Sequence, residues 1–328
     1  MQQEKTTIRF GVGLVLVALL LRLFSGSLLA PVLDVVLTPE AVKFLFFLQT
    51  GRFTRLAEPP QVQAPPALPI ATPAPEAAVF APGDGDFVAI NSYCGYDTDT
   101  AALLCAPLDW NLTDGGPKVL ILHSHGSESY QKTENYQETT QYRTLDTQYN
   151  VVSLGDRLAQ LLEDGGVEVI HDRSLHDYPS YTSAYSQARK SIQGYLKQYP
   201  EICLVLDLHR DALQDSKGNQ VGYTVDTPAG KAAKVMLVVG TDANGLSHPN
   251  WQENLALAVK LHAQLEKKTP GLCRPISFRA QRFNQDLSTG ALIVEVGAAG
   301  NTRQEALSSI DLLAQGILRL AWGTEPMY

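Results

Sequence analysis

Short apolar runs alternate with segments of helical period from residue 86 to the end of the chain. Runs of this length, bounded by polar or turn residues, are typical of buried strands. The predicted strands are 119–122, 167–170, 203–208, 235–240, 276–278 (an edge strand) and 292–296, with an edge element or substrate-side lobe at 87–96. The predicted helices are 150–164, 179–199, 251–267 and 301–322, the last with Asn301 or Thr302 as its N-cap. This alternation predicts an α/β fold with an open, mostly parallel sheet flanked by helices.

A different pattern occupies the N-terminal region. Residues 1–9 are polar, 10–21 carry no charge, and apolar character continues past Arg22 as far as residue 33. A membrane span needs about 20 residues, so we expect a transmembrane anchor over 10–33, with Arg22 reaching towards an interface. A cleaved signal peptide is the alternative. Its small-residue cleavage site would be poor, which favours an uncleaved anchor.

Two further segments separate the predicted anchor from the globular region. Residues 34–56 contain a short apolar-rich helix candidate at 40–49, which is expected to lie on the membrane or on a partner. Residues 57–85 hold eight of the 19 prolines and show no apolar periodicity, as in an extended, semi-rigid linker. The predicted order is therefore a polar tail (1–9), an anchor, a membrane-proximal helix, a linker and a globular domain over 86–328.

Charge and cysteine content exclude some classes of function. The formal net charge is -8 and no basic stripe is present, so nothing favours binding to nucleic acid. None of the four cysteines forms a CxxC pair, which argues against a structural zinc knuckle. Outside a membrane, Cys94 and Cys105 would form a local disulfide or remain two thiols, and the sequence leaves both open.

Imidazole and carboxylate side chains gather at the C-terminal ends of three predicted strands. They are His123, His125 and Glu128 after the first, Asp207, His209, Arg210 and Asp211 in CLVLDLHRDA, and Glu295 in ALIVEVG. Each alone is most simply a satisfied structural polar group. Because open α/β sheets bind ligands at these strand ends, the three together predict one site for a metal such as zinc, with an open coordination position.

Five longer stretches resemble the stage II sporulation protein P family. They are HSHGSESY (123–130), HDRSLHDYPSY (171–181), DLHRDA (207–212), VGTDANGLSHPNW (239–251) and ALIVEVGAAGNT (291–302). The resemblance covers roughly residues 85 to 325. It implies a zinc-dependent cell-wall hydrolase with a fold like that of the N-acetylmuramoyl-L-alanine amidases.

Matching of these motifs implies roles for single residues. Glu295 corresponds to the catalytic glutamate, and His209 and Glu128 correspond to zinc ligands. The third ligand is His123 or His125, and the related amidases slightly favour His125. In those amidases the ligand glutamate lies further along, at the start of the first helix.

That departure from the related amidases leaves a second carboxylate open as the ligand. Asp146 is the carboxylate nearest to the corresponding position in this chain. Glu128 therefore remains the expected ligand with Asp146 as its alternative.

Other polar residues of the motifs are expected to support the site. Arg210 and Asp211 would brace His209 or bind a substrate carboxylate. The cluster His171, Asp172, His176 and Asp177 is interpreted as a network that supports the ligands or stabilises a loop. Recognition of the stem peptide or orientation of a ligand imidazole is the alternative. A loop with Asp242 and His248 is expected to line the cleft, whereas His262 is assigned to packing. No GxSxG elbow or serine triad is present.

The resulting expectation is a membrane-anchored zinc-dependent peptidoglycan hydrolase of sporulation and engulfment. It would cleave the N-acetylmuramoyl-L-alanine amide, and the family also implies endopeptidase action on stem cross-links. Implied partners are a sporulation D-type lytic transglycosylase and a sporulation M-type membrane protein. The catalytic domain would be extracytoplasmic, at the septum, on a single-pass anchor. Alternatives are another zinc peptidase of this fold, a non-catalytic cell-wall-binding module and a structural septal tether.

Overall fold

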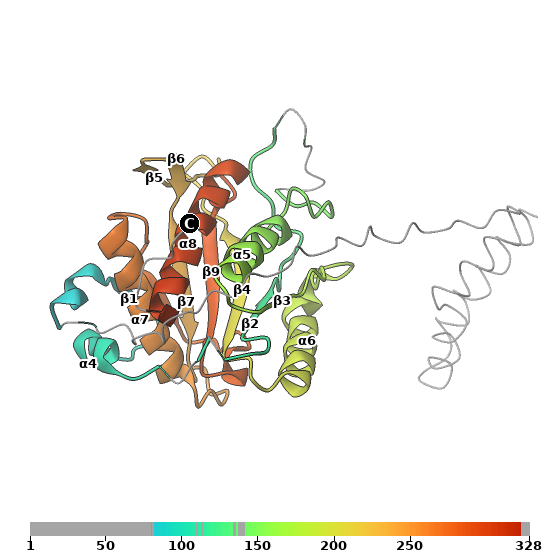
Figure 1. Ribbon diagram of the computed structural model, residues 1–328. Helices are drawn as coiled ribbons and strands as arrows, with labels where there is room; N and C mark the ends of the chain where they lie inside the picture. Colours follow the sequence, from blue (N-terminus) through green and yellow to red (C-terminus); the bar gives the residue numbers. More distant parts are fainter. Residues whose placement is uncertain are drawn as a thin grey trace, which may run out of the picture. The chain divides into compact units, whose positions relative to one another are not determined.

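A seven-stranded sheet forms the centre of the structure, a computed structural model (Figure 1). The strand order is β1-β8-β7-β9-β4-β2-β3, and every neighbouring pair is parallel except β7 and β9. The strands are β1 (Ile90–Ser92), β2 (Val119–Leu122), β3 (Val169–His171), β4 (Leu204–Asp211), β7 (Val235–Gly240), β8 (Ile276–Arg279) and β9 (Ala291–Ala298). The expected α/β fold with a mostly parallel sheet is confirmed.

The structure describes residue 80 and residues 82–322, apart from 109–110, 113, 134–135 and 137–141. The predicted tail, anchor and membrane-proximal helix, and most of the linker, lie outside these residues. Within the described part of the chain, we find no helix that is both long enough and apolar enough to cross a bilayer.

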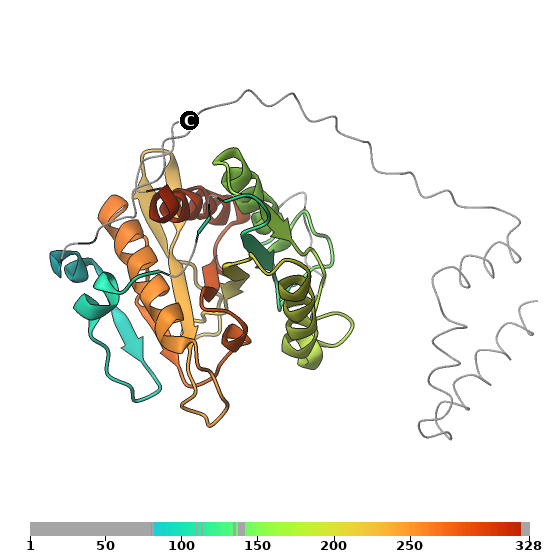
Figure 2. The ribbon, with the colours of Figure 1, turned by 60° about the horizontal axis from the view of Figure 1, so that its bottom comes forward.

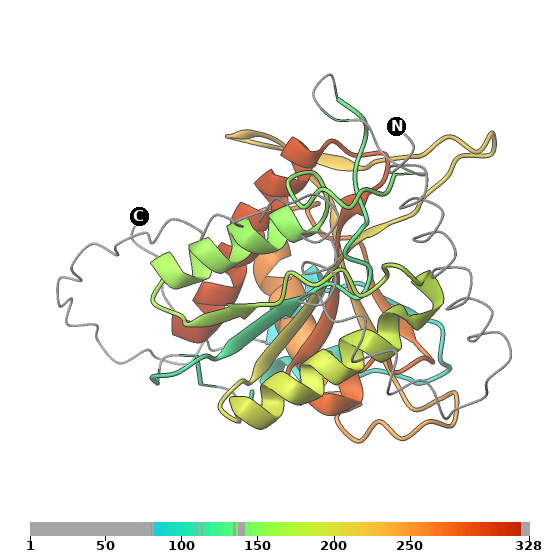
Figure 3. The same ribbon diagram turned by 90° about the vertical axis from the view of Figure 1, so that its right-hand side faces the viewer.

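Helices cover both faces of the sheet. They are α4 (Thr100–Cys105), α5 (Val152–Asp164), α6 (Ala184–Gln198), α7 (Trp251–Lys268) and α8 (Arg303–Trp322), with 3-10 turns η1 (Pro82–Phe87), η2 (Tyr181–Ser183) and η3 (Gln285–Leu287). Helices α5, α7 and α8 share the larger apolar core with one face, and α6 packs on the other. Figure 3 shows the strands passing between α6 and the pair α5 and α8, and Figure 2 places β1 and α4 on the side away from α6.

The sheet contains two sets of strands that run in opposite directions. Strands β7, β8 and β1 are parallel to one another, but β7 is antiparallel to β9. Parallel neighbours need a crossover connection, usually a helix. Between β4 and β7 the chain instead forms the hairpin of β5 (Thr224–Thr227) and β6 (Gly230–Ala233). The loop after β7 therefore leaves the sheet beside the start of β9.

The predicted strands 119–122 and 235–240 match β2 and β7 to the residue, and other elements differ at their ends. Strand β4 continues to Asp211, so His209 lies within it. Helix α6 begins at Ala184 instead of 179, after η2. Helix α4 and the β5–β6 hairpin were not predicted. All four cysteines are free thiols, Cys94 and Cys105 included.

Helix α8 begins with a reciprocal capping box. The hydroxyl of Thr302 accepts a hydrogen bond from Glu305 N (3.2 Å), and the Glu305 carboxylate accepts one from Thr302 N (3.0 Å). Of the two predicted N-caps, Thr302 therefore caps the helix. Asn301 instead accepts a hydrogen bond from Ala298 N, at the end of β9.

Candidate active site

Register along β4 and β9 places His209 directly beside Glu295. Paired residues on adjacent parallel strands point to the same face of a sheet, here the face on which α6 packs. One oxygen of Glu295, Oε2, is buried without a hydrogen-bond partner. Burial raises the pKa of Glu295 to about 8. The structure therefore brings the predicted base and the firmest predicted ligand together.

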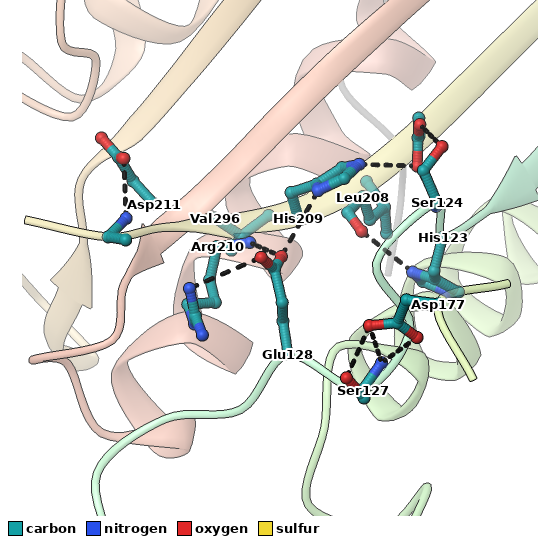
Figure 4. Close-up of polar contacts among 12 residues, drawn as sticks. His123, Ser124, Ser127, Glu128, Asp177, Leu208, His209, Arg210, Asp211 and Val296 are labelled. Atoms are coloured by element: carbon teal, nitrogen blue, oxygen red, sulfur yellow. Dashed lines mark hydrogen bonds and ion pairs between the residues drawn. The ribbon is translucent and has the colours of Figure 1, made fainter. Parts of the chain in front are cut away.

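Glu128 joins this pair from the turn after β2. Its Oε2 lies 3.3 Å from Nδ1 of His209 and also accepts a hydrogen bond from Arg210 N at 3.2 Å (Figure 4). Burial opposes ionisation of Glu128, but the His209 contact and the charge of Arg210 outweigh it and lower its pKa to about 2. Asp146, the alternative ligand, is exposed and accepts from Gln148 N within its own loop. Geometry thus favours Glu128.

The imidazole of His209 stands between two buried carboxylates. Nδ1 faces Glu128 (Figure 4). Nε2 lies 2.9 Å from Oδ1 of Asp207, although this approach does not have the alignment of a full hydrogen bond. Burial opposes protonation of the ring, but the charge of Asp207 and the contact with Glu128 raise the pKa of His209 well above its ordinary value. The charges of the three buried groups therefore compensate one another.

His125 lies against the same imidazole. Its ring meets that of His209 edge to face, with centroids 5.4 Å apart. It stacks on Tyr181 at 4.5 Å and meets Tyr185 edge to face at 5.5 Å. Its Nδ1 is buried without a hydrogen-bond partner. An imidazole held by two aromatic rings, with a free buried nitrogen, is well placed to bind a ligand.

His123, the other candidate, uses both of its ring nitrogens elsewhere. Nδ1 lies 3.0 Å from the carbonyl oxygen of Leu208, and Nε2 lies 2.8 Å from Nε2 of His171. Nδ1 of His171 in turn lies 3.0 Å from Oδ1 of Asp156, so the three side chains form a row of polar contacts. Of the two histidines, the structure therefore brings His125 to His209, and His123 belongs to a buried network below it.

Arg210 holds the loop that follows Glu128. Its guanidinium donates to the carbonyl oxygens of Ser129 (2.9 Å) and Tyr142 (3.0 Å). Asp211, at the end of β4, pairs with Arg274 at 2.6 Å. These contacts hold the loop after Glu128 and the end of β4 and do not reach His209, so the two roles expected for Arg210 and Asp211 stay predictions.

The predicted cluster after β3 also braces the site from behind. Nδ1 of His176 lies 3.0 Å from the carbonyl oxygen of His123, and Nε2 lies 3.0 Å from Ser191 Oγ and 3.4 Å from Asp172. Asp177 accepts hydrogen bonds from the backbone and hydroxyl of Ser127. These contacts agree with the loop-stabilising interpretation of the cluster.

Asp242 and His248 are not brought to the site. They lie in the loop after β7, and because β7 is antiparallel to β9, this loop leaves the sheet at the start of β9 and not at its end. Asp242 accepts a hydrogen bond from the Tyr96 hydroxyl at 2.9 Å, and His248 is buried. A parallel β7 would have brought this loop to the same edge of the sheet as the ends of β4 and β9, and the antiparallel β7 does not.

Three donors of the cluster have the chemistry of a zinc site. In this conformation, no three His, Cys, Asp or Glu side chains of the described residues are grouped closely enough to hold a metal ion. Two imidazoles and one carboxylate are nevertheless a donor set that zinc uses with one position left open. The unpartnered Nδ1 of His125 and the contact between Glu128 and Nδ1 of His209 fit such a site. His125, Glu128 and His209 are therefore the residues that could hold the ion.

The family model for stage II sporulation protein P matches residues 74–318. This chain belongs to the stage II sporulation protein P family. A member from Bacillus subtilis (strain 168) is 28% identical over 226 residues, which is 65% of this chain and 53% of that protein. The chain thus spans about half the length of the curated relative it matches. The family expected from the sequence motifs is confirmed.

Solved structures of N-acetylmuramoyl-L-alanine amidases are similar to the chain. One from Clostridium difficile 630 is 15% identical with a TM-score of 0.38, covering 64% of this chain and 97% of that chain. A catalytic domain from Bacillus (Paenibacillus) polymyxa var. colistinus is 16% identical with a TM-score of 0.37, covering 62% and 95%.

Every residue of the candidate site lies within the range matched by the stage II sporulation protein P family. Sequence reasoning did not assign a role to several neighbours that the structure adds, namely Asp207, Ser124, Arg143, Tyr181 and Tyr185. Asp207 could have been assigned to the site from the sequence, because it lies two residues before His209 and residues two apart on a strand share a face. The aromatic contacts of His125 depend on loop positions and had no such signal.

Proposed function

We propose that this member of the stage II sporulation protein P family is a zinc-dependent peptidoglycan hydrolase. Its substrate would be the amide between the lactyl group of N-acetylmuramic acid and the L-alanine of the stem peptide. Family membership supports a role in sporulation. The observation that carries the proposal is the pairing of Glu295 with His209 on adjacent strands, with an oxygen of Glu295 buried and unpartnered.

In this proposal His125, Glu128 and His209 hold the zinc ion. Bound there, zinc would polarise the scissile carbonyl and lower the pKa of water at the open position. Arg210 fixes Glu128 through its backbone N–H and fixes the following loop through its guanidinium. Tyr181 and Tyr185 hold the ring of His125 by aromatic contact.

Glu295 would act as the general base and then as the general acid. Its carboxylate takes a proton from the attacking water and returns it to the nitrogen of the leaving L-alanine. Its position on a strand, in register with a ligand, keeps the base at a set distance from the centre where the bond breaks. An exchange of one proton in each direction leaves Glu295 unchanged at the end of the cycle.

The cellular setting is part of the same proposal. An uncleaved anchor over 10–33 would hold the enzyme in the membrane, and the Pro-rich segment 57–85 would carry the domain into the wall at the sporulation septum. Partners of the sporulation D type (a lytic transglycosylase) and M type (a membrane protein), and endopeptidase action on cross-links, rest on the family resemblance alone.

The test uses the full chain with purified peptidoglycan, with and without a chelator, followed by mass spectrometry of the released fragments. We expect free stem peptides and intact glycan chains, loss of release with chelator, and recovery when zinc is restored. Release that is insensitive to chelator would contradict the zinc centre. Cleaved cross-links with stems still attached to the glycan would contradict the amidase assignment and identify a peptidase.

A further inference from the structure

One buried carboxylate contacts both segments that carry the proposed zinc ligands. Asp207, only 6% exposed, lies two residues before His209 on the same face of β4. It accepts hydrogen bonds from Ser124 N at 2.7 Å and from Ser124 Oγ at 2.5 Å. Its Oδ1 also lies 2.9 Å from Nε2 of His209. Ser124 immediately precedes His125, so Asp207 joins the strand to the turn after β2.

The two carboxylates Asp207 and Glu128 approach different nitrogens of the His209 ring. Glu128 faces Nδ1 and Asp207 faces Nε2. Both carboxylate oxygens of Asp207 accept hydrogen bonds from Ser124, whereas Glu128, a proposed zinc ligand, lies beside Nδ1 of His209. Nδ1 is therefore the nitrogen that faces the proposed zinc position.

We propose that Asp207 is a positioning residue for metal binding. It directs Nδ1 of His209 towards the zinc position by attracting Nε2, and it holds the turn that presents His125 through Ser124. A carboxylate behind a ligand imidazole fixes the ring orientation, and removal of such a partner typically costs about 10–100-fold in metal affinity. This inference rests on the zinc centre of the proposed function.

The chain provides a matched control in the same turn. Asp177 is equally buried, at 7% exposed, and accepts hydrogen bonds from Ser127 N (3.1 Å) and Ser127 Oγ (2.5 Å). This contact repeats the backbone and hydroxyl pattern of Asp207 with Ser124. Among the described residues, Asp177 makes no hydrogen bond or ion pair with an imidazole. Its third partner is Arg143 at 2.9 Å, which also lies 3.5 Å from Glu128. The two carboxylates therefore differ in whether they touch a proposed ligand.

The experiment measures zinc affinity of the full chain by competition with a chromophoric chelator, independently of hydrolysis. Asp207→Asn keeps the size of the side chain and removes its charge, so we expect a fall of about 10–100-fold. Asp177→Asn is expected to change the affinity by less than about threefold. Equal losses of zinc affinity in the two variants would overturn the proposal, because Asp207 would then only stabilise the turn, as Asp177 does.

A second pair of variants keeps the test independent of how well Asp207→Asn folds. Ser124→Ala removes one of the hydrogen bonds that hold Asp207 and is expected to lower zinc affinity, whereas Ser127→Ala is not. Nitrogen NMR of the zinc-loaded protein should show Nδ1 of His209 as the metal-bound atom in the wild type. Binding through Nε2 would overturn the proposal.

The outcomes separate this inference from the proposed function. A wild-type chain that binds no zinc would overturn both. Zinc bound equally well by the wild type, Asp207→Asn and Ser124→Ala would overturn only the positioning role of Asp207.

Discussion

Strands β4 and β9 have two faces with contrasting chemistry. On one face, Leu204, Leu206 and Leu208 pack with α5, α7 and α8 in the larger apolar core. On the other face, the alternating positions hold Asp207 and His209, with Glu295 beside them. Burial is extensive on both faces, but the first is stabilised by apolar area and the second by charges that compensate one another.

The contrast separates the residues that fold the domain from those that would perform the chemistry. Burial of an uncompensated charge is costly, and the polar face avoids much of this cost by placing His209 between Glu128 and Asp207. Glu295 is the exception, since one of its oxygens has no partner. We therefore expect changes on the apolar face to alter stability and changes on the polar face to alter zinc binding or turnover.

The largest effect is expected at Glu295. Glu295→Gln keeps the shape of the side chain but cannot accept a proton, so turnover on peptidoglycan should fall by about 100- to 10,000-fold. Zinc content and thermal stability should stay close to those of the wild type, because a buried carboxyl with a pKa of about 8 is largely neutral at pH 7, as the amide is. Zinc stoichiometry, melting temperature and fragment release measure the three quantities. A variant with wild-type turnover would show that the base is elsewhere.

Truncation on the opposite face should give the reverse result. Leu206 is fully buried in the larger core, and Leu206→Ala should lower the free energy of unfolding by about 2–5 kcal/mol. Zinc bound per folded molecule should not change, because the side chain points away from His209. Urea denaturation gives the stability and metal analysis of the folded protein gives the zinc. Loss of zinc from molecules that remain folded would break the separation of the two faces.

A smaller effect is expected where α5 crosses the buried histidine network. Gly155 has no side chain, and a Cβ there would lie 2.7 Å from Nε2 of His123 and closer still to His171. Gly155→Ala should therefore destabilise the fold by about 1–3 kcal/mol through overpacking. A Cβ added at Gly194, in α6, would meet no atom within 4 Å, so Gly194→Ala is the control. Gly194→Ala should be neutral or stabilising, because Ala favours the helix more than Gly does. Similar losses in both variants would show that the close approach to His123 and His171 does not set the cost.

The smallest effect concerns the ion pair between α6 and η3. Burial alone would raise the pKa of Asp286, but the hydrogen bonds from Arg189, at 2.7 and 2.8 Å, outweigh it and lower the pKa. A lowered folded-state pKa contributes stability that is complete above the ordinary Asp pKa of about 4 and is lost as the pH falls through the folded value.

Replacement of Asp286 should remove this pH dependence. Asp286→Asn should lower the free energy of unfolding by about 1 kcal/mol at pH 7, and the difference from the wild type should shrink as the pH approaches 3. Unfolding curves at several pH values measure the trend. A difference that stays constant with pH would indicate that packing of η3, and not the charge of Asp286, stabilises this region.

Much of the sheet could be predicted from the sequence, for a simple physical reason. Strands β2 and β7 are unbroken apolar runs bordered by polar residues, so burial determines their ends. The start of α6 was harder to predict from the sequence. The Ser183 hydroxyl donates a hydrogen bond to the carbonyl oxygen of Ser180, and this local contact competes with helix formation there. The hairpin β5–β6 is largely polar and short, and its apolar pattern is too weak to predict a pair of strands.

The candidate site was predictable in its residue types and less so in its geometry. Strand ends indicated His209, Glu128 and Glu295, but the pairing of His209 with Glu295 depends on register between strands far apart in the chain. The choice between His123 and His125 depends on which ring nitrogens are already engaged. The direction of β7 had a signal that was not used, since no helical pattern separates it from β4.

The register between His209 and Glu295 also has a consequence for motion. Their backbones belong to one hydrogen-bonded ladder in the centre of the sheet, where local opening requires most of the free energy of global unfolding. His125 and Glu128 lie outside this ladder, on a turn held by local hydrogen bonds, such as the one from Glu128 N to the carbonyl oxygen of His125 at 3.0 Å, and by side-chain contacts. Amide hydrogens there should exchange with solvent sooner than those of β4 and β9. We therefore expect the β4–β9 half of the site to be the more rigid one and the turn to relax as a ligand enters.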